Sequence, residues 1–321
     1  MSLPEALTRP MSLPVVGSPL FIVSSPELVI AQCQAGVIGS FPALNARPQS
    51  VLSDWLDQID DELARFAADN PDKPVAPYAV NQIVHRSNDR LEQDVQSCID
   101  HQVPIVITSL GARPEVYEAI HSYGGIVLHD VINNEFARKA IDKGADGIIA
   151  VAAGAGGHAG TQSPLALIQE IREWFDGPLL LSGAIAHGRS ILAAQAAGAD
   201  FAYIGSAFIA TQEANADERY KQMLVDSTAS DIVYSNLFTG VHGNYLRGSI
   251  EAAGLDPVAL PESDPSKMNF GSGGNTKSKA WKDIWGSGQG IGMVKDVPPV
   301  AEVVARLSQE YADARARLFA A

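Results

Sequence analysis

The sequence predicts a barrel of eight parallel β-strands with helices between them, the TIM-barrel fold, and a small cap after the eighth strand. Short apolar runs alternate with longer amphipathic segments up to residue 210, as parallel strands and their crossover helices do. The runs are apolar throughout, which is typical of strands covered on both faces. Eight such units in about 200 residues favour a closed barrel, because open doubly wound sheets usually stop near six strands.

Strands and helices are expected in alternation along the chain. The expected strands are residues 20–24, 37–41, 77–81, 105–109, 126–130, 147–151, 179–183 and 201–206. The segments expected as helices are residues 50–68, 89–101, 114–123, 134–143, 164–175 and 188–197. Gly36, Gly144 and Gly198 follow three helical segments, where glycine can take the left-handed conformation that ends a helix.

The alternation divides the chain into three parts. The barrel is expected over residues 1–211 and a cap over its mouth at residues 212–284. In the cap segment a proline-rich turn and the glycine-rich stretch 271–279 interrupt the alternation of apolar runs and helical segments. Residues 285–321 are expected to return to the barrel and to end in an amphipathic helix over 297–320. Active sites of such barrels lie at the carboxyl ends of the strands, so functional residues should follow each run.

Composition favours a cytoplasmic protein that acts on small molecules. The 321 residues are 46% hydrophobic with a net charge of −14, and the absence of a lysine or arginine run argues against nucleic acid or an anionic membrane as partner. No apolar run approaches the roughly 20 residues of a membrane helix, and the N-terminal region lacks a signal-peptide pattern. Cys33 and Cys98 fit buried thiols in a reducing compartment rather than a disulfide framework.

A glycine-rich loop at residues 154–160 follows the sixth expected strand. It contains a Gly-x-Gly-x-x-Ala match, but a dinucleotide fingerprint opens a helix at once, and here residues 161–164 intervene. What remains is a flexible loop that presents His158. A histidine can act as a general base near neutral pH because its ordinary pKa is about 6.5. The alternative is a loop histidine bonded to a neighbouring carbonyl, and the position at a barrel strand end favours the base.

The ends of the seventh and eighth strands carry small residues. They are Ser-Gly-Ala-Ile at 182–185 and Gly-Ser-Ala-Phe at 205–208. Loops after these two strands are the usual phosphate site of such barrels, where backbone amides and a serine hydroxyl can bind the anion. The glycines could also be simple turn formers, but two such ends in the two expected positions favour phosphate binding.

Four segments together resemble the nitronate monooxygenase family, formerly called 2-nitropropane dioxygenases. They are the Ala-Gly-Gly-His loop at 155–158, LLLSGAIAHG at 179–188, GADFAYIGSAFIAT at 198–211 and IWGSGQGIGMV at 284–294. The resemblance implies FMN bound at the strand ends of a barrel. It also implies oxidative cleavage of an alkyl nitronate by dioxygen to a carbonyl compound and nitrite, with the nitronate or nitroalkane and O2 as the partners.

The resemblance assigns roles to particular residues. His158 would be the catalytic base, with Gly156 and Gly157 passing near the flavin. Gly183, Gly205 and Ser206 would hold the flavin phosphate. Asn81, in the Ala-Val-Asn-Gln segment, would bond the isoalloxazine ring. Gln289, in Gly-Ser-Gly-Gln-Gly, would approach the flavin from the C-terminal segment.

Two positions depart from the family pattern. Many members carry Gln-Gly-Gly-Met or similar at the end of the first strand, whereas this chain has Val-Ser-Ser at 23–25. Ser24 is expected to keep the backbone contact with the flavin, in altered surroundings of the ring. A polar residue usually lies seven places before the histidine, and here that position is Val151. The second departure bears on the substrate more than on the cofactor.

Other residues carry weaker signals. His129, beside Asp130 at the end of the fifth strand, could face the pyrimidine side of the flavin as a cation, although a structural pair is an equal alternative. The segment 271–278 lacks the glycine that a phosphate loop needs before Lys277 and is better read as a lid. Trp281, Trp285 and Tyr245 could line a substrate pocket. The other histidines lack metal-ligand spacing, so no metal is expected.

Two alternatives to a nitronate monooxygenase remain open. One is a reductase that uses NAD(P)H and FMN, of the quinone or enoyl-acyl-carrier-protein type, although residues 82–88 lack the proline-rich loop of the quinone reductases. The other is a flavin-binding protein without catalysis, because Val151 and the first strand end are altered. The sequence is compatible with a homodimer.

Overall fold

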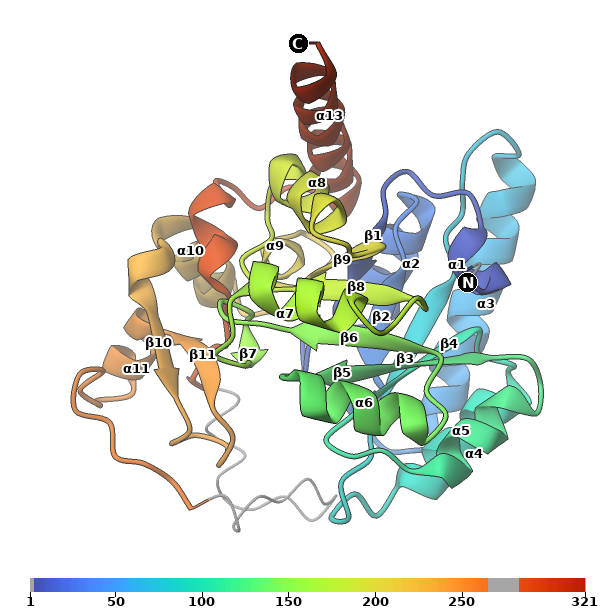
Figure 1. Cartoon of the computed structure of the whole chain (residues 1–321), viewed down its shortest axis with the longest axis horizontal. Coiled ribbons are helices and arrows are strands. Elements are labelled where there is room, and N and C mark those ends of the chain that lie inside the picture. The colour runs from blue at the N-terminus through green and yellow to red at the C-terminus, as the bar shows by residue number, and fades with distance from the viewer. Residues whose placement is uncertain (1–2, 265–282, 321) are drawn as a thin grey trace.

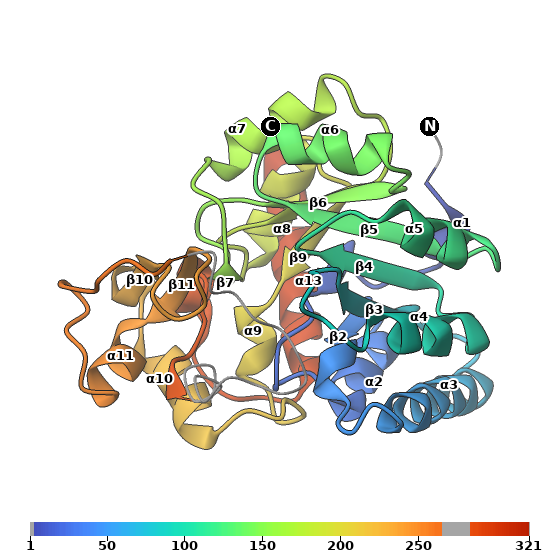
Figure 2. The same cartoon turned by 90° about the horizontal axis from the view of Figure 1, so that it is seen from below.

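The computed structural model describes residues 3–264 and 283–320 and contains the predicted barrel (Figures 1 and 2). Its eight parallel strands are β1 (Val15–Gly17), β2 (Gly39–Pro42), β3 (Tyr78–Ile83), β4 (Ile105–Ser109), β5 (Ile126–Val131), β6 (Gly147–Val151), β8 (Leu179–Ser182) and β9 (Phe201–Ile204). The ends of this sheet, β1 and β2, meet through a bridge between Val16 and Ile38, where Gly17 N donates to Ile38 O at 2.7 Å. The sheet therefore closes on itself.

Helices surround the strands in the expected alternation. They are α2 (Pro26–Gln34), α3 (Val51–Asp69), α4 (Leu91–Asp100), α5 (Pro114–His121), α6 (Asn134–Asp142), α7 (Pro164–Arg172), α8 (Gly188–Ala196) and the short α9 (Ser206–Ile209). Gly36, Gly144 and Gly198 have φ angles of 84°, 104° and 114°. These values confirm that glycine ends three of the helices in the left-handed conformation.

The first strand was predicted in the wrong place. Residues 20–24 form a turn, and the strand lies earlier, at Val15–Gly17. The side chain of Asn45 explains the turn, because its Nδ2 donates to both Leu20 O at 2.9 Å and Ser24 O at 2.8 Å. The Ser24 hydroxyl closes the same turn by accepting from Leu20 N–H at 2.9 Å. These side-chain hydrogen bonds replace the backbone ladder that the apolar run alone suggested.

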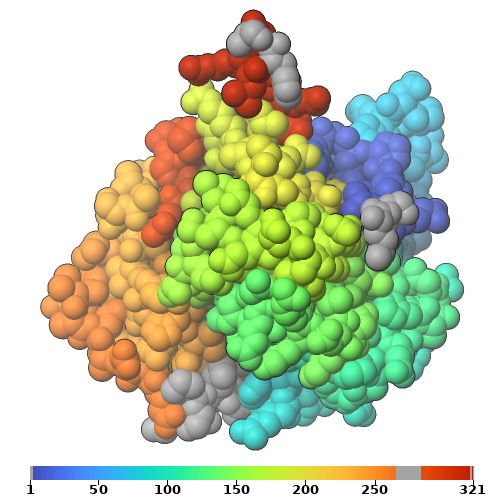
Figure 3. Space-filling view, in the orientation of Figure 1, coloured from blue at the N-terminus to red at the C-terminus, as the bar shows by residue number. Residues whose placement is uncertain are grey.

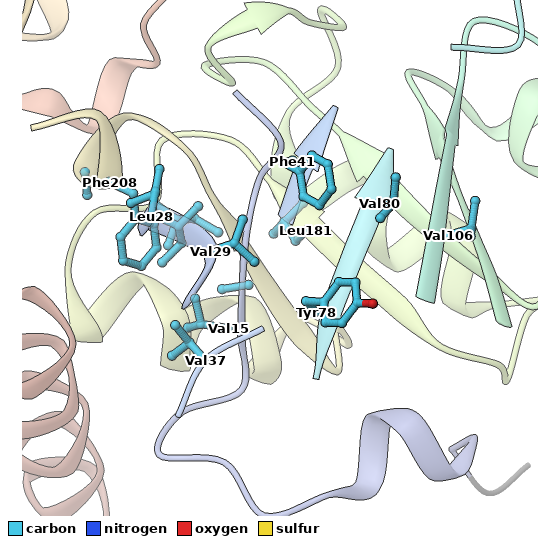
Figure 4. Close-up of a cluster of buried hydrophobic side chains, with 14 of the residues drawn as sticks. Val15, Leu28, Val29, Val37, Phe41, Tyr78, Val80, Val106, Leu181 and Phe208 are labelled. Atoms are coloured by element: carbon cyan, nitrogen blue, oxygen red, sulfur yellow. The ribbon is translucent and has the colours of Figure 1, made fainter. Parts of the chain in front are cut away.

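Two apolar layers make the core. Alternate strand residues point into the barrel, among them Val16, Ile38, Ile107, Leu128 and Leu180, and the short helix α1 (Glu5–Thr8) adds Leu7 to them. The opposite strand faces pack against the helices, and Figure 4 shows part of this layer. This alternation is the expected consequence of strands whose successive side chains face opposite sides.

A smaller sheet and two helices form the cap beside the barrel (Figures 1 and 2). The cap contains α10 (Glu218–Asp226), α11 (Arg247–Ala252) and the antiparallel strands β10 (Ile232–Ser235) and β11 (Gly243–Leu246). The third strand of its sheet is β7 (Gly157–His158), which belongs to the glycine loop of the barrel. Residues 265–282, with the 271–278 segment and Trp281, lie outside the described residues.

The C-terminal segment returns to the barrel. A 3₁₀ helix, η5 (Gln289–Met293), leads to α13 (Val300–Phe319), which packs against α8 and α2. Figure 3 shows the last turns of α13 projecting from the body. None of the described helices is both long enough and apolar enough to span a membrane.

Candidate active site

The carboxyl ends of the barrel strands open into a cavity of about 1170 Å³. Its lining includes residues from the ends of six different strands: Asn81, Ser109, Asp130, Val151, Ser182 and Gly205. The cap adds Tyr234 and His242. Large pockets at this end of a barrel are the usual sites of ligand binding and catalysis, so the cavity is the candidate active site.

The glycine loop forms one wall of the cavity, and hydrogen bonds join it to the C-terminal segment and to the cap. Gln289 N donates to Gly154 O at 2.9 Å, and the buried Asn244 side chain donates to Ala155 O at 2.6 Å. A side-chain carbon added at Gly156 would lie 2.7 Å from the backbone nitrogen of Gly288. Only glycine therefore allows the loop to lie this close to the C-terminal segment.

His158 lies on this loop and lines the cavity. Its Nε2 is 3.0 Å from the hydroxyl oxygen of Thr239 in the cap. Burial lowers the pKa of His158 to about 4, because the charged ring would lose solvation. The imidazole is therefore neutral at pH 7 and retains one nitrogen that can accept a proton.

A chain of hydrogen bonds joins three neighbouring strand ends. Asn81 Nδ2 donates to the Ser109 hydroxyl at 2.8 Å and to Ile107 O at 3.1 Å, and Ser109 donates in turn to Asp130 at 2.6 Å. Both amide protons of Asn81 are thus used inside the protein. Its Oδ1 is left as the acceptor for a donor in the cavity.

Asp130 is the acidic end of this chain. Burial raises the pKa of Asp130 to about 6, and the hydrogen bond from Ser109 offsets part of that increase. From the sequence, Asp130 stands out only as the neighbour of His129. Its place at a strand end was the available signal, because residues there face the barrel mouth.

His129 also lines the cavity, but as a neutral ring. Its Nδ1 is 2.7 Å from the hydroxyl of Thr108 and 3.1 Å from that of Tyr117. Burial lowers the pKa of His129 to about 4, and the nearby positive charge of Lys143 lowers it further. In this arrangement burial favours the neutral ring, which acts as a hydrogen-bonding group, and a contact of His129 with the flavin stays a prediction.

Two glycines and a serine meet where the seventh and eighth barrel strands end. A side-chain carbon at Gly183 would lie 2.8 Å from Ala153 O, and one at Gly205 would lie 2.6 Å from the Ser18 hydroxyl. The Ser206 hydroxyl accepts from Gly288 N–H at 2.8 Å, which leaves its own proton as a donor. A hydroxyl and closely approaching glycine backbone are groups that fit a phosphate.

The cavity brings together eight of the ten predicted site residues. They are Asn81, His129, Gly156, Gly157, His158, Gly183, Gly205 and Ser206. Ser24 is buried in the turn that replaces the expected first strand, and it is absent from the cavity lining. The side chain of Gln289 is exposed, and its backbone supports the glycine loop from behind.

Thr239 was not identified from the sequence. It lies 81 residues from His158 along the chain, between two cap strands, in a segment without a recognisable motif. The pairing of β7 with β11 helps to bring the two side chains together. Of the aromatic residues proposed for a substrate pocket, Trp285 lines the cavity, whereas Tyr245 is buried in the cap core.

Comparisons with known proteins agree on the family and the fold. A family model described as nitronate monooxygenase matches residues 7–310. The nitronate monooxygenase of Paraburkholderia phytofirmans is 25% identical over 345 aligned positions that cover 92% of each chain. That of Neurospora crassa is 27% identical over 222 positions, covering 62% of this chain. Alignments with three of the curated relatives, this last one included, span 57–60% of the relatives' own length.

Solved structures share the whole fold. A nitroalkane oxidase from Streptomyces ansochromogenes superposes with a TM-score of 0.79 and 26% identity, over 98% of this chain and all of that one. The FabK protein of Thermotoga maritima superposes with a TM-score of 0.76 at 22% identity, over 98% of this chain and 96% of its own. The second likeness concerns the fold alone.

Proposed function

The chain belongs to the nitronate monooxygenase family, and on this premise we propose that it binds FMN and oxidises alkyl nitronates with dioxygen to a carbonyl compound and nitrite. Membership of this family makes it an oxidoreductase. The observation that carries the specific proposal is the position of His158, a neutral imidazole on a glycine loop in the wall of the large cavity. The substrates in this proposal are small molecules.

The residues of the cavity fit the flavin. Gly183, Gly205 and Ser206 would hold its phosphate, at loops where a side-chain carbon has no room. The Oδ1 of Asn81 would accept a hydrogen bond from the ring, since its Nδ2 is engaged by Ser109 and Ile107. When bound, FMN would supply the transfer of electrons from the substrate to dioxygen.

His158 would act on the substrate's proton. A neutral nitroalkane must lose a proton from carbon before it becomes a nitronate, and a neutral imidazole can accept it. A preformed nitronate has already lost that proton, so its oxidation does not need a base. The cap and the C-terminal segment form part of the cavity wall and would limit the access of water to this step.

One experiment tests the proposal against both alternatives. The purified protein is mixed without oxygen with propyl nitronate in one cuvette and with NADH in another, and the flavin absorbance is followed. Bleaching by the nitronate alone supports the proposed function, and nitrite should then form when oxygen is admitted. Bleaching by NADH alone would assign the chain to the reductases, and a protein without visible absorbance would contradict the flavin itself. A yellow protein inert to both reagents and to quinones would favour a flavin-binding protein without catalysis.

A further inference from the structure

Ile22 has an unusual backbone conformation at the mouth of the barrel. It lies in the turn after β1, with a φ angle of 69°, and it is 43% exposed. The left-handed conformation crowds a β-branched side chain against the backbone, so glycine or asparagine is the usual residue there. An isoleucine that is both strained and exposed is not what the fold alone would select.

Two asparagine side chains hold the backbone of Ile22 from different segments. Asn45 Oδ1 accepts from the N–H of Ile22 at 2.9 Å, and Asn215 Nδ2 donates to its carbonyl at 3.2 Å. Both bonds use backbone atoms, which a glycine would supply equally well. These contacts therefore account for the conformation of the turn but not for the isoleucine side chain.

Exposed apolar residues gather at the cavity that contains His158. Of the residues that the structure describes, nine large apolar ones are exposed, and four of them line this cavity: Ile22, Ile132, Phe136 and Tyr234. Ile132 and Phe136 are 41% and 46% exposed. Exposed apolar side chains are ordinary when they are scattered singly, but a group of them in one pocket indicates a surface that an apolar ligand covers.

Ile132 and Phe136 lie close to the loop of His158. A side-chain carbon added at Gly160, on that loop, would lie 2.9 Å from Ile132 O and 3.1 Å from Ile132 Cβ. Phe136 follows in the first turn of α6, where its N–H donates to Asn133 Oδ1 at 2.8 Å. This apolar surface is therefore next to the proposed base.

The barrel topology places Ile22 on the other side of the mouth. The strands follow one another around the closed sheet in the order β1-β9-β8-β6-β5-β4-β3-β2, so β5 is opposite β1. Ile22 follows β1, whereas Ile132 and Phe136 follow β5. The cavity that all three line, of about 1170 Å³, exceeds the roughly 300–1,000 Å³ of a pocket for one drug-sized ligand. A flavin therefore leaves room for a substrate larger than ethyl nitronate.

We propose that Ile22 is a specificity-determining residue, which together with Ile132 and Phe136 binds the hydrocarbon chain of the substrate. The proposal rests on the proposed function for the reacting group: the nitronate carbon lies at His158, and its chain extends over Ile132 and Phe136 towards Ile22. The substrate class is then a long-chain alkyl nitronate, such as hexyl nitronate, in preference to ethyl nitronate. The isoleucine places hydrocarbon where the usual glycine would leave the chain exposed to water.

Binding of alkyl carboxylates tests this subsite without turnover. A carboxylate is a planar anion with two oxygens, as a nitronate is, and it carries no group that the proposed reaction oxidises. Isothermal titration calorimetry on the holoenzyme measures the Kd of butanoate, hexanoate and octanoate. In the wild type we expect binding to tighten by about three- to fourfold per methylene. A Kd that does not depend on chain length would overturn the proposal.

Two variants of Ile22 test its own part in the subsite. Glycine and asparagine both accept the left-handed conformation, so Ile22→Gly and Ile22→Asn should keep the turn. Each should reduce the gain in affinity between hexanoate and octanoate, and the Kd for FMN should remain that of the wild type. An undiminished gain in both variants would overturn the role of Ile22. A weaker affinity for FMN with an unchanged dependence on chain length would do the same, because it would assign the side chain to the flavin site.

Leu165→Ala is the matched control for Phe136→Ala. Both residues are exposed in the first turn of a helix that follows a barrel strand, but Leu165 does not line the cavity. Phe136→Ala should weaken the binding of octanoate by about fivefold, because part of the buried apolar surface is lost. Leu165→Ala should leave it unchanged. An equal loss in the two variants would show that the cavity surface has no specific role.

Turnover separates the subsite from the proposed function. The kcat/KM for hexyl nitronate should exceed that for ethyl nitronate by about tenfold or more, and Ile22→Gly should lower this ratio. Equal values for the two nitronates would overturn the subsite and leave the proposed function intact. If the wild type bound carboxylates with the expected dependence on chain length but oxidised neither nitronate, the proposed function would fail while the hydrocarbon subsite stood.

Discussion

The hydroxyl of Ser109 donates a 2.6 Å hydrogen bond to the carboxylate of Asp130, at the ends of two adjacent barrel strands. This bond favours the charged carboxylate, yet burial prevails and raises the pKa of Asp130 to about 6. The folded protein thus holds the proton of this group more tightly than the unfolded chain, whose aspartate has a pKa near 4. The network that orients Asn81 therefore contains a group that destabilises the fold at neutral pH.

Asp130→Asn should stabilise the protein in a pH-dependent way. Because the folded pKa is raised, the unfavourable contribution is absent below about pH 4 and complete above about pH 6, where it reaches up to about 3 kcal/mol. Asparagine can still accept from Ser109 and carries no charge. The variant's melting temperature minus that of the wild type should be several degrees larger at pH 7 than at pH 4. A difference that is constant with pH would contradict this assignment.

His158→Asn should keep the flavin bound and discriminate between substrates. Oxidation of neutral nitroalkanes should slow by about 10²–10⁴-fold, because the base that accepts the proton is lost. Oxidation of preformed nitronates should be much less affected. Steady-state rates on the two forms of the same compound measure the difference, and an equal loss on both would exclude the role of general base.

The wild-type pH profile should reflect the partly buried imidazole of His158. Burial lowers the pKa of His158 to about 4, so the ring is unprotonated and competent above that pH and becomes protonated below it. The kcat/KM for a neutral nitroalkane should therefore keep its base-competent plateau through neutral pH and decline only as the pH approaches 4. A decline centred near 6.5, the value of an exposed histidine, would show that the ring is solvated during turnover.

Gly183→Ala should weaken flavin binding. The residue has a φ angle of 148°, and the added carbon would lie 2.8 Å from Ala153 O, so the loop must move. We expect a loss of about 1–3 kcal/mol in stability and a measurable increase in the Kd for FMN. Gly292→Ala is the matched control, because nothing lies within 4 Å of its added carbon. Equal flavin affinities in the two variants would remove Gly183 from the phosphate site.

Gly188→Ala should destabilise the fold without affecting the site. Gly188 begins α8, and an added carbon would overlap the backbone nitrogen of Tyr311 and lie 2.6 Å from Leu307 O in α13. The two helices must separate, which should cost about 2 kcal/mol or more and lower the melting temperature. The flavin spectrum and affinity should remain those of the wild type. A fall in flavin affinity equal to that in Gly183→Ala would show that the two regions are coupled.

The strands were predictable where local sequence and tertiary environment agree. The fourth and sixth strands lie at the predicted residues 105–109 and 147–151, because their apolar runs are buried on both faces. The first strand was misplaced because Asn45, more than 20 residues away, binds the backbone of residues 20–24. Apolar character alone does not distinguish a strand from a turn that a distant amide stabilises.

The site was predictable to the extent that it follows the ends of the strands. His158 could be placed because its loop follows an apolar run, at the end of the barrel where sites form, whereas Asn81 was assigned through the family resemblance. The charge state of His129 could not be predicted, because it depends on burial and on hydroxyls from two other elements. Thr239 could not be predicted from the sequence, because its contact with His158 forms when the cap folds against the glycine loop.

Because β7 belongs to the cap sheet, the cap cannot be exchanged independently of the loop that carries His158. A cap that contributed only walls to the cavity could be exchanged between relatives as a separate module, with the chemistry left intact in the barrel. Here the strand that bears the histidine is shared by both parts, so a new cap would have to rebuild the register between His158 and Gly243. Insertions between β10 and β11 would displace the segment that holds Thr239 and His242 against the loop of His158, even if no residue in the barrel changed.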